Sequence, residues 1–294
     1  MKILVSDGNF HLHRGWSTVG FRSSAPMERV PKQVLSWFCS YALELDCDAG
    51  LIAFDGSQNF RHQVYANYKA GRAGATGMGA KLVEDGPFEG RTHHEAVYAS
   101  LKPTKELFRS LGFKVLHPKT FEADDVLVGA AYKLSKLGHH VYLDTNDKDM
   151  VQAVSKNVSI YHAEMTNRPR EILTPANLPA MKFGLSPKQF LDYQTLMGDE
   201  VDGIPCVSAM TKSTALEILR EHGSLEKFFA TKKGDYFYRL RRTELHRNRK
   251  LVRMDKDAFT CSLEEMLFKN LKGEVAVKAF TVLRDQQRKG SLFG

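Results

Sequence analysis

The 294-residue sequence lacks the features that mark secreted and membrane-inserted chains. It has no run of about 18 consecutive apolar residues, and its amino terminus leads into a strand pattern without the apolar stretch of a signal peptide. Its 4 cysteines include no C-x-x-C pair, so neither a disulfide framework nor a zinc site is indicated. We therefore expect a cytoplasmic protein without a membrane partner, for example in a bacterial or phage-infected cell.

Acidic residues are also in the minority. The chain carries 42 Lys and Arg against 34 Asp and Glu, which gives a formal net charge of +8 and a pI near 9.2. This excess indicates a polyanionic partner such as nucleic acid, although a charge that serves only solubility is the alternative. Apolar residues make up 43% of the chain, enough for one large domain or two smaller ones.

The apolar patterns predict an α/β fold in two parts. Strands are expected at 2–6, 50–54, 114–116, 140–144 and, more weakly, 158–161, with helical patterns between them. Strand signals become rare after about residue 172, where the pattern turns helical. We predict a mixed, mostly parallel, twisted sheet flanked by helices over residues 1–172, followed by a helical region over residues 173–294.

The scarce acids are concentrated at a few places. Four follow predicted strands, three lie at a helix start after Phe121, and two lie in the loop that follows Met197. The nine candidates are Asp7, Asp55, Glu122, Asp124, Asp125, Asp147, Asp149, Asp199 and Asp202. Because ligands of open α/β sheets bind beyond the carboxyl ends of the strands, we expect these acids to converge.

A converged set of carboxylates needs positive charge between its members. Any one of these acids, taken alone, is ordinarily a helix cap, but like charges gathered together repel strongly. Hard cations such as Mg²⁺ or Mn²⁺ prefer oxygen ligands, and nine carboxylates exceed what one magnesium ion uses. The sequence therefore predicts two divalent ions, an arrangement that hydrolyses phosphodiesters.

Basic and aromatic residues alternate between residues 59 and 72. A single helix there would place Arg61, Tyr65, Tyr68 or Lys69, and Arg72 on one face suited to a nucleic-acid strand; an amphipathic helix with half-buried tyrosines is the alternative. The following glycine-rich segment, which contains Lys81, is expected to form a loop or arch over about residues 71–100, or a plain surface insertion. Near the end of the chain, residues 232–256 are rich in Arg and Lys and form either a solvated helix or a polyanion track.

These stretches together resemble the 5′-nucleases: the flap endonucleases, the 5′-3′ exonuclease domain of bacterial DNA polymerase I and the small phage exonucleases. The similar motifs are Asp7-Gly8, Phe54-Asp55-Gly56, Phe60-Arg61, Tyr68-Lys69-x-x-Arg72, Glu122-Ala123-Asp124-Asp125, Thr145-Asn146-Asp147-Lys148-Asp149 and Met197-Gly198-Asp199-x-x-Asp202-x-Ile204-Pro205. They occur in family order over residues 1 to about 230. The resemblance implies a PIN-like nuclease core followed by a DNA-binding region of helix-hairpin-helix type.

The resemblance also implies roles for individual residues. Asp7, Asp55, Glu122 and Asp124 resemble ligands of a first metal ion, and Asp147, Asp149, Asp199 and Asp202 those of a second, with Asp124 or Asp125 between them. Lys69 and Arg72 resemble the basic pair that contacts the scissile phosphate, and Tyr68 resembles the residue on which the terminal base stacks.

One motif departs from the family. Where the family has a glycine-rich hairpin after Ile-Pro, this chain has Cys206-Val207-Ser208-Ala209-Met210-Thr211 and none of the three glycines. Because glycine permits close backbone approach and positive φ, we expect duplex binding to be weaker or placed differently, with reduced or absent potassium dependence. Lys212, Ser213 and Thr214 remain able to reach phosphate through their side chains.

The sequence thus predicts a metal-dependent 5′-3′ exonuclease or flap endonuclease of replication, primer removal or repair. Its expected ligand is DNA with a free 5′ end, flap, nick or gap, and we expect a monomer, with a separate DNA polymerase as a candidate partner. An RNase H-like nuclease that acts on RNA-DNA hybrids and a non-catalytic branched-DNA binding protein are the alternatives.

Overall fold

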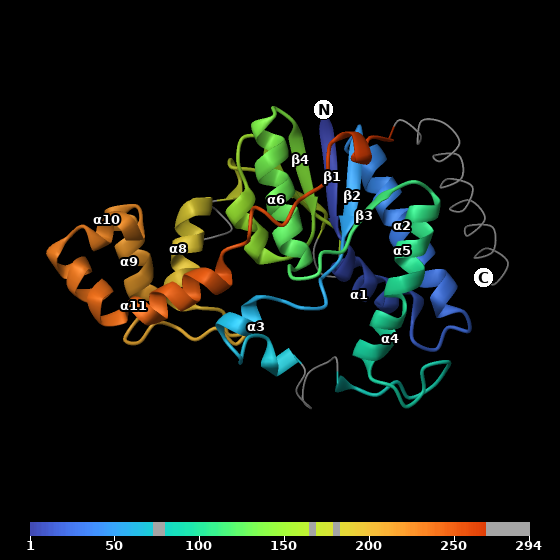
Figure 1. Ribbon diagram of the computed structural model, residues 1–294, viewed down its shortest axis with the longest axis horizontal. Helices are drawn as coiled ribbons and strands as arrows, with labels where there is room; N and C mark the ends of the chain where they lie inside the picture. Colours follow the sequence, from blue (N-terminus) through green and yellow to red (C-terminus); the bar gives the residue numbers. More distant parts are fainter. Residues whose placement is uncertain (73–79, 165–168, 179–182, 269–294) are drawn as a thin grey trace.

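A twisted six-stranded sheet forms the centre of the described part of the molecule (Figure 1). The computed structural model describes residues 1–72, 80–164, 169–178 and 183–268. The strands are β1 (Lys2–Asp7), β2 (Ala49–Ala53), β3 (Lys114–Leu116), β4 (His140–Asp144), β5 (Val158–His162) and β6 (Glu171–Leu173), in the order β3-β2-β1-β4-β5-β6. Only the β5–β6 pair is antiparallel. The predicted mixed, mostly parallel sheet is confirmed; the short strand β6 was not foreseen.

The order in which strands are added to the sheet reverses at β1. The chain builds β2 and β3 on one side of β1 and then places β4 on the other side. Ser6 pairs with Asp144 and Asp7 pairs with Ala53, so the carboxyl ends of three strands meet at one edge. Such a switch point is where open α/β sheets bind their ligands.

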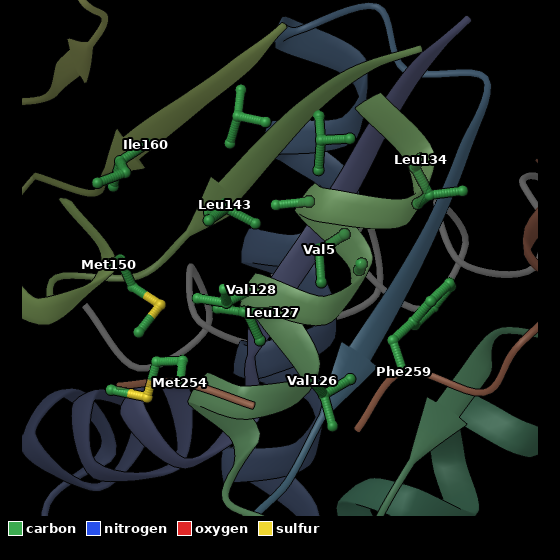
Figure 2. Close-up of a cluster of buried hydrophobic side chains, with 14 of the residues drawn as sticks. Val5, Val126, Leu127, Val128, Leu134, Leu143, Met150, Ile160, Met254 and Phe259 are labelled. Carbon is green, nitrogen blue, oxygen red and sulfur yellow. The ribbon is translucent and has the colours of Figure 1, made fainter. Parts of the chain in front are cut away.

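Side-chain alternation along β1 explains the two covered faces of the sheet. Ile3 and Val5 pack with helix α6 (Ala123–Lys136), whereas Leu4 points to the opposite face. The opposite layer consists of α1 (Gly8–Val19), α2 (Pro26–Glu44) and α5 (Leu101–Ser110). Figure 2 shows Val126, Leu127 and Leu134 of α6 directed at the sheet. Helix α6 therefore starts at the edge where the strands end.

The second part of the chain is helical, as predicted. It contains α8 (Pro187–Met197), α9 (Lys212–His222), α10 (Leu225–Phe229) and α11 (Lys232–Val252). Ser186 caps α8 in a capping box with Gln189, and Pro187 occupies the first turn, so the helix starts where its sequence signal lies. Thr174-Pro175 is a sequence signal of the same kind, but it yields only a turn among the described residues, and residues 179–182 lie outside them.

After α11 the chain returns to the α/β core. The segment over residues 253–268 crosses α6, and Met254, Phe259 and Met266 join the core beneath that helix (Figures 1 and 2). It ends in a 3-10 turn, η4 (Glu264–Met266), and an isolated bridge between Ala49 and Leu267. The helical part is thus tied to the core at both ends, while the predicted division near residue 172 stays a prediction.

One expectation about helices is wrong. The single helix over residues 59–72 is replaced by the short α3 (Arg61–Val64) and a 3-10 turn, η1 (Ala70–Arg72), because Tyr65 adopts an extended backbone with φ of −151°. The helical pattern before β3 is confirmed as α4 (His93–Ala99) and α5, which meet at Ser100, whose buried hydroxyl accepts a hydrogen bond from Trp16. None of the described helices has the length and apolar character needed to cross a membrane.

Candidate metal and nuclease site

Asp7 lies where β1 meets β4 and α1. As the N-cap of α1, it accepts a hydrogen bond from the Phe10 N–H at 3.0 Å through Oδ1. Its Oδ2 accepts one from the Thr145 hydroxyl at 3.1 Å, directly after β4. The Asp7 carboxylate is thereby fixed at the switch point of the sheet.

Asp55 connects this position to the start of α6. Its Oδ1 accepts from the N–H of Ala123, the first residue of α6, at 2.8 Å, and its Oδ2 accepts from the Asn9 amide at 2.7 Å. The negative charges of Asp55 and Asp147 raise the pKa of Asp7. The negative charges of Asp147 and Glu122 raise the pKa of Asp124. Asp7, Asp55, Glu122, Asp124 and Asp147 therefore form one electrostatic group, drawn from three strand ends and one helix start.

The remaining candidates lie around an adjoining cavity of about 310 Å³. The residues that line it are Asn146, Asp147, Lys148, Asp149, Asp199, Val201 and Asp202. Asp149 begins the 3-10 turn η3 (Lys148–Ala153), where its N–H donates to Asp147 Oδ1 at 2.7 Å, and Gln194 of α8 donates to its Oδ1 at 2.6 Å. Asp147 thus belongs to both groups of acids.

Burial and mutual repulsion disfavour full ionisation of these acids. Burial, followed by repulsion from Asp55, raises the pKa of Asp7 to about 7. Burial, followed by Asp147 and Asp199, raises the pKa of Asp149 to about 7. The pKa of Asp124 is raised as well, first by burial and then by Asp147 and Asp7. The site therefore has a strong electrostatic preference for added positive charge.

Two lysines supply part of that charge in this structure. Lys69 pairs with Glu122 and lies 3.9 Å from Asp202, while Lys148 Nζ lies 2.7 Å from Asp199 Oδ2. The pKa of Glu122 is lowered despite its burial, because Lys69 and then Arg61 stabilise its ionised form. The structure confirms that Lys69 lies against the predicted acids, although its role in catalysis stays a prediction.

The position of Lys69 depends on an unusual backbone conformation. Lys69 has a φ of 54°, in the left-handed region that is unfavourable for side-chain-bearing residues. Its N–H donates to the Asp202 carbonyl at 2.8 Å. Beside it, Gly203 has a φ of 68°, and a Cβ there would lie 2.8 Å from the Asn67 oxygen. Close contact with the loop over residues 198–205 thus holds Lys69 beside the acids.

Asp125 has a different role from the one expected. Its Oδ1 accepts from Arg61 Nη2 and the Asp255 N–H, and its Oδ2 accepts from Arg61 Nη1 and the Glu122 N–H, at 2.7 to 3.1 Å. These four bonds fill the lone-pair positions of a carboxylate that is 0% exposed. The expectation that Asp125 lies between two metal ions is wrong for this structure, because its oxygens are committed to structural bonds.

Arg61 was expected on a DNA-binding face, and this expectation is also wrong. The side chain is 0% exposed, donates to the carbonyl oxygens of Leu251 and Arg253, and holds Glu122 through Nη1 at 3.1 Å. The Arg61–Asp125 pair therefore joins the start of α6 to the end of α11. The neighbours of Arg61 in the sequence, Phe60 before it and the polar His62 and Gln63 after it, fit an exposed and a buried cation equally.

The other residues predicted to bind DNA lie at several places. Tyr68 is 2% exposed and donates to Glu122 at 2.9 Å, so its ring is not presented for base stacking in this conformation. Tyr65 is half-buried, with Arg247 over its ring at 5.2 Å. Lys81 is exposed beside the bridge between Leu82 and Thr92. The side chain of Arg72 and residues 73–79 of the expected arch lie outside the described part of the chain.

The hairpin that lacks glycines has, at one position, a backbone conformation that usually requires glycine. Ala209, at one of the three glycine positions, has a φ of 63°. Thr211, at another, caps α9 by accepting from the Thr214 N–H at 3.2 Å. Ser213 is exposed in the first turn of α9, and Lys212 Nζ lies 4.3 Å from the Phe183 ring. Ala209 thus has a left-handed backbone without being glycine, whereas reduced duplex and potassium binding stay predictions.

A buried polar network beneath Asp7 was missed from the sequence. Asp144 Oδ2 accepts from the Ser6 hydroxyl at 2.7 Å and lies 2.7 Å from His11 Nε2, and all three residues are 0% exposed. The network joins β1, β4 and α1 directly behind Asp7 and Thr145. Its only sequence signal was polar residues inside apolar segments.

The donor set fits hard divalent cations by its chemistry. It consists of carboxylates, several of which are buried and destabilised as anions, and such groups favour Mg²⁺ or Mn²⁺. Among the described residues, no three acidic, His or Cys side chains are arranged as a ready-made cage for one ion. Lys69 and Lys148 hold two of the acids instead.

Comparison with known proteins identifies the family. A family model described as the 5′-3′ exonuclease N-terminal resolvase-like domain matches residues 2–181, and one described as the 5′-3′ exonuclease C-terminal SAM fold matches residues 185–274. The chain belongs to the 5′-3′ exonuclease family. The expectation of a nuclease, and of a helical unit after the α/β core, is confirmed at the level of that family.

Named relatives agree with this assignment. The chain is 35% identical over 232 residues to a thermostable DNA polymerase I of Thermus aquaticus, which covers 76% of this chain and 24% of the relative. It is 28% identical over 233 residues to a 5′-3′ exonuclease of Buchnera aphidicola subsp. Schizaphis graminum, covering 77% of this chain and 72% of the relative. The chain thus spans about a quarter of the polymerase relatives' length.

Solved structures share the fold. A bacteriophage T5 flap endonuclease in complex with DNA and metal ions matches with a TM-score of 0.67 at 21% identity, covering 88% of this chain and 91% of that one. A T5 5′-exonuclease with bound divalent zinc matches with a TM-score of 0.65 at 21% identity, over the same shares of both chains.

We predict that Asp125→Asn and Asp124→Asn have opposite effects on stability. Asp125→Asn removes the doubly hydrogen-bonded carboxylate of the two that neutralise the buried Arg61, and should lower the free energy of unfolding by about 3 kcal/mol. Asp124→Asn removes a repelled, buried carboxylate and should leave stability unchanged or raise it. Urea unfolding in the presence of chelator measures both; equal effects would contradict the structural assignment of Asp125.

The raised pKa values predict a pH dependence. Asp7 and Asp149 have folded-state pKa values of about 7, above their ordinary 3.8, so their protonation favours the folded state. Without divalent ions, this contribution should be complete below about pH 4 and lost as the pH rises through about 7. Thermal unfolding from pH 4 to 8, with chelator or with Mg²⁺, measures it; stability that rises throughout this range in chelator would contradict the prediction.

Ala209→Gly should stabilise the protein. The substitution relieves a left-handed alanine at the hairpin, a gain of about 1 kcal/mol that glycine's greater freedom in the unfolded chain partly offsets. The matched control is Ala230→Gly, where φ is −74° and the same change should destabilise by about 0.5 to 1 kcal/mol. Denaturant unfolding compares the two; destabilisation by both would show that Ala209 is not strained.

Proposed function

We propose that this chain hydrolyses phosphodiester bonds of DNA at or near 5′ ends, as a 5′-3′ exonuclease with flap-endonuclease activity, in replication, primer removal or repair. The observation that carries the proposal is the convergence of carboxylates from three strand ends, the start of α6 and the loop over residues 198–205. The named activities of the relatives support the choice of nuclease chemistry.

The residues that would hold divalent ions fall into two groups. Asp7, Asp55, Glu122 and Asp124 would serve one ion, and Asp147, Asp149, Asp199 and Asp202 a second. We propose Mg²⁺ or Mn²⁺, because the donors are carboxylate oxygens. When bound, such ions supply Lewis-acid chemistry that lowers the pKa of water and offsets the charge on phosphate.

The chain's own residues bind and orient the substrate. Lys69, now paired with Glu122, is the cation placed to contact a phosphate once the carboxylates are neutralised. Asn9 and Thr145 orient Asp55 and Asp7 by hydrogen bonds. The buried Arg61 keeps Glu122 ionised and fixed at the start of α6. Each of these groups is held in position before the substrate binds, so less free energy is spent on reorienting charged groups during the reaction.

The proposal predicts Mg²⁺-dependent cleavage of 5′-labelled flapped, nicked, gapped and blunt DNA by the purified chain. Asp124→Ala should reduce turnover by at least about 100-fold, because it removes a carboxylate common to the cluster, and chelator should abolish turnover. Circular dichroism and unfolding curves establish that the variant is folded. Calorimetric titration of Mn²⁺ provides a second readout, in which Asp124→Ala should bind fewer or weaker ions.

Parallel assays separate the alternatives. Faster cleavage of an RNA-DNA hybrid than of flapped DNA would replace the proposed substrate by RNA. Binding of flapped DNA without cleavage under any divalent ion would identify a non-catalytic branched-DNA binding protein. Cleavage that persists in Asp124→Ala at the wild-type rate would overturn the metal assignment.

A further inference from the structure

A second concave region lies on the outside of the molecule, at the end of α11. It has a volume of about 850 Å³ and is lined by Tyr132 of α6, by Phe60 before α3 and by residues between 246 and 257. The charged and aromatic side chains that matter are Tyr132, Lys250, Arg253 and Lys256. We call this region the basic pocket. The Arg61–Asp125 pair lies between it and the carboxylates, because Asp125 accepts from the N–H of Asp255, which lines the pocket.

Positive charge in the basic pocket is only partly compensated within the chain. Within the described residues, Lys250, Arg253 and Lys256 take part in no ion pair, whereas the neighbouring Arg249 pairs with Asp192 and Glu226. Asp255 and Asp257 also line the pocket, and the Asp257 N–H donates to Asp255 Oδ1 at 2.8 Å. Cations gathered without equal counter-charge attract an external anion.

Tyr132 organises one wall of the pocket. The ammonium of Lys256 lies 4.1 Å from its ring centre and that of Lys136 lies 4.0 Å from it, and Lys136 also donates to the Tyr132 hydroxyl at 2.6 Å. These contacts bring two cations together from α6 and from the segment after α11. The wall therefore combines an aromatic face with localised positive charge, the combination used to bind nucleic-acid strands.

Helix α11 carries the same charge towards the pocket. The cations Arg242 and Lys250 are exposed and lie eight residues apart, so they share one helix face, with the exposed His246 between them. Arg253, the C-cap of α11, continues this line into the pocket. An extended polyanion that lies along this face meets cations over about three helical turns before it reaches Tyr132.

We propose that the basic pocket and the exposed face of α11 bind the phosphodiester backbone of the nucleic-acid substrate at a site separate from the carboxylates. The choice of ligand rests on the proposed nuclease function. Recognition is by charge alone, because the Tyr132 ring already holds Lys136 and Lys256, so the site accepts any sequence. Such a contact increases affinity for long substrates and leaves the reacting groups unchanged.

The experiment compares Lys250→Glu and Lys256→Glu with the full-length wild type. The probe is a flapped DNA with long duplex arms, and its binding is measured by fluorescence anisotropy in chelator at several salt concentrations. Each variant should weaken binding about 3- to 10-fold near 0.1 M salt and lower the salt slope by about one. Lys156→Glu, an equal charge change at an exposed turn before β5, is the matched control and should alter neither quantity.

Turnover assays with Mg²⁺ distinguish this site from the catalytic one. Lys250→Glu should raise KM for the long substrate about as much as it weakens binding, with kcat unchanged. Lys250→Arg should retain wild-type binding. Wild-type affinity and salt slope in both glutamate variants would overturn the proposal even if the wild type cleaves DNA. An equal loss of affinity in Lys156→Glu would show that only net charge matters, and would also overturn the proposal. If the wild type neither binds nor cleaves DNA, the proposed function itself is overturned.

Discussion

Repulsion among buried carboxylates is the constraint on which the rest of this structure depends. Two like charges about 4 Å apart repel by about 4 kcal/mol even at an effective dielectric constant of about 20. The fold nevertheless brings Asp7, Asp124 and Asp147 together where β1 and β4 end, and the raised pKa values of Asp7 and Asp124 express that cost. A fold under selection for stability alone has no reason to hold this arrangement, so the cost points to function.

The structure divides neighbouring acids between two tasks. Asp124 and Asp125 are adjacent in the sequence at the start of α6, but successive helical positions point about 100° apart. Asp124 faces the other carboxylates, whereas Asp125 faces Arg61 and has every oxygen position bonded. The paired acid fixes the start of the helix, and the repelled acid is the one left for a cation. The bonds that fix Asp125 therefore also hold Asp124 in place beside the other carboxylates.

The parts that sequence could predict are those encoded locally. Strands β1, β2 and β4 are apolar runs ended by acids, and Ser186-Pro187 is a capping signal, so their positions follow from the nearby residues. Arg61 could not be placed in this way. Its partners Asp125, Leu251 and Arg253 are far away in the chain, and the same residue fits an exposed basic face until the fold brings them together. The backbone at Ala209 could not be predicted either, because its φ of 63° is one that local preference disfavours for alanine.

Lysine pairing places a cation of the chain itself beside each group of acids. Lys69 holds Glu122 and Lys148 holds Asp199, so each group of acids has a cation of its own. Both lysines are attached by flexible side chains, unlike the buried Arg61, and can turn away when stronger positive charge arrives. A released Lys69 would then be available to a phosphate at the moment the carboxylates no longer need it. The same side chain can thus stabilise the clustered acids and contact the substrate, which accounts for the strained backbone that keeps it beside them.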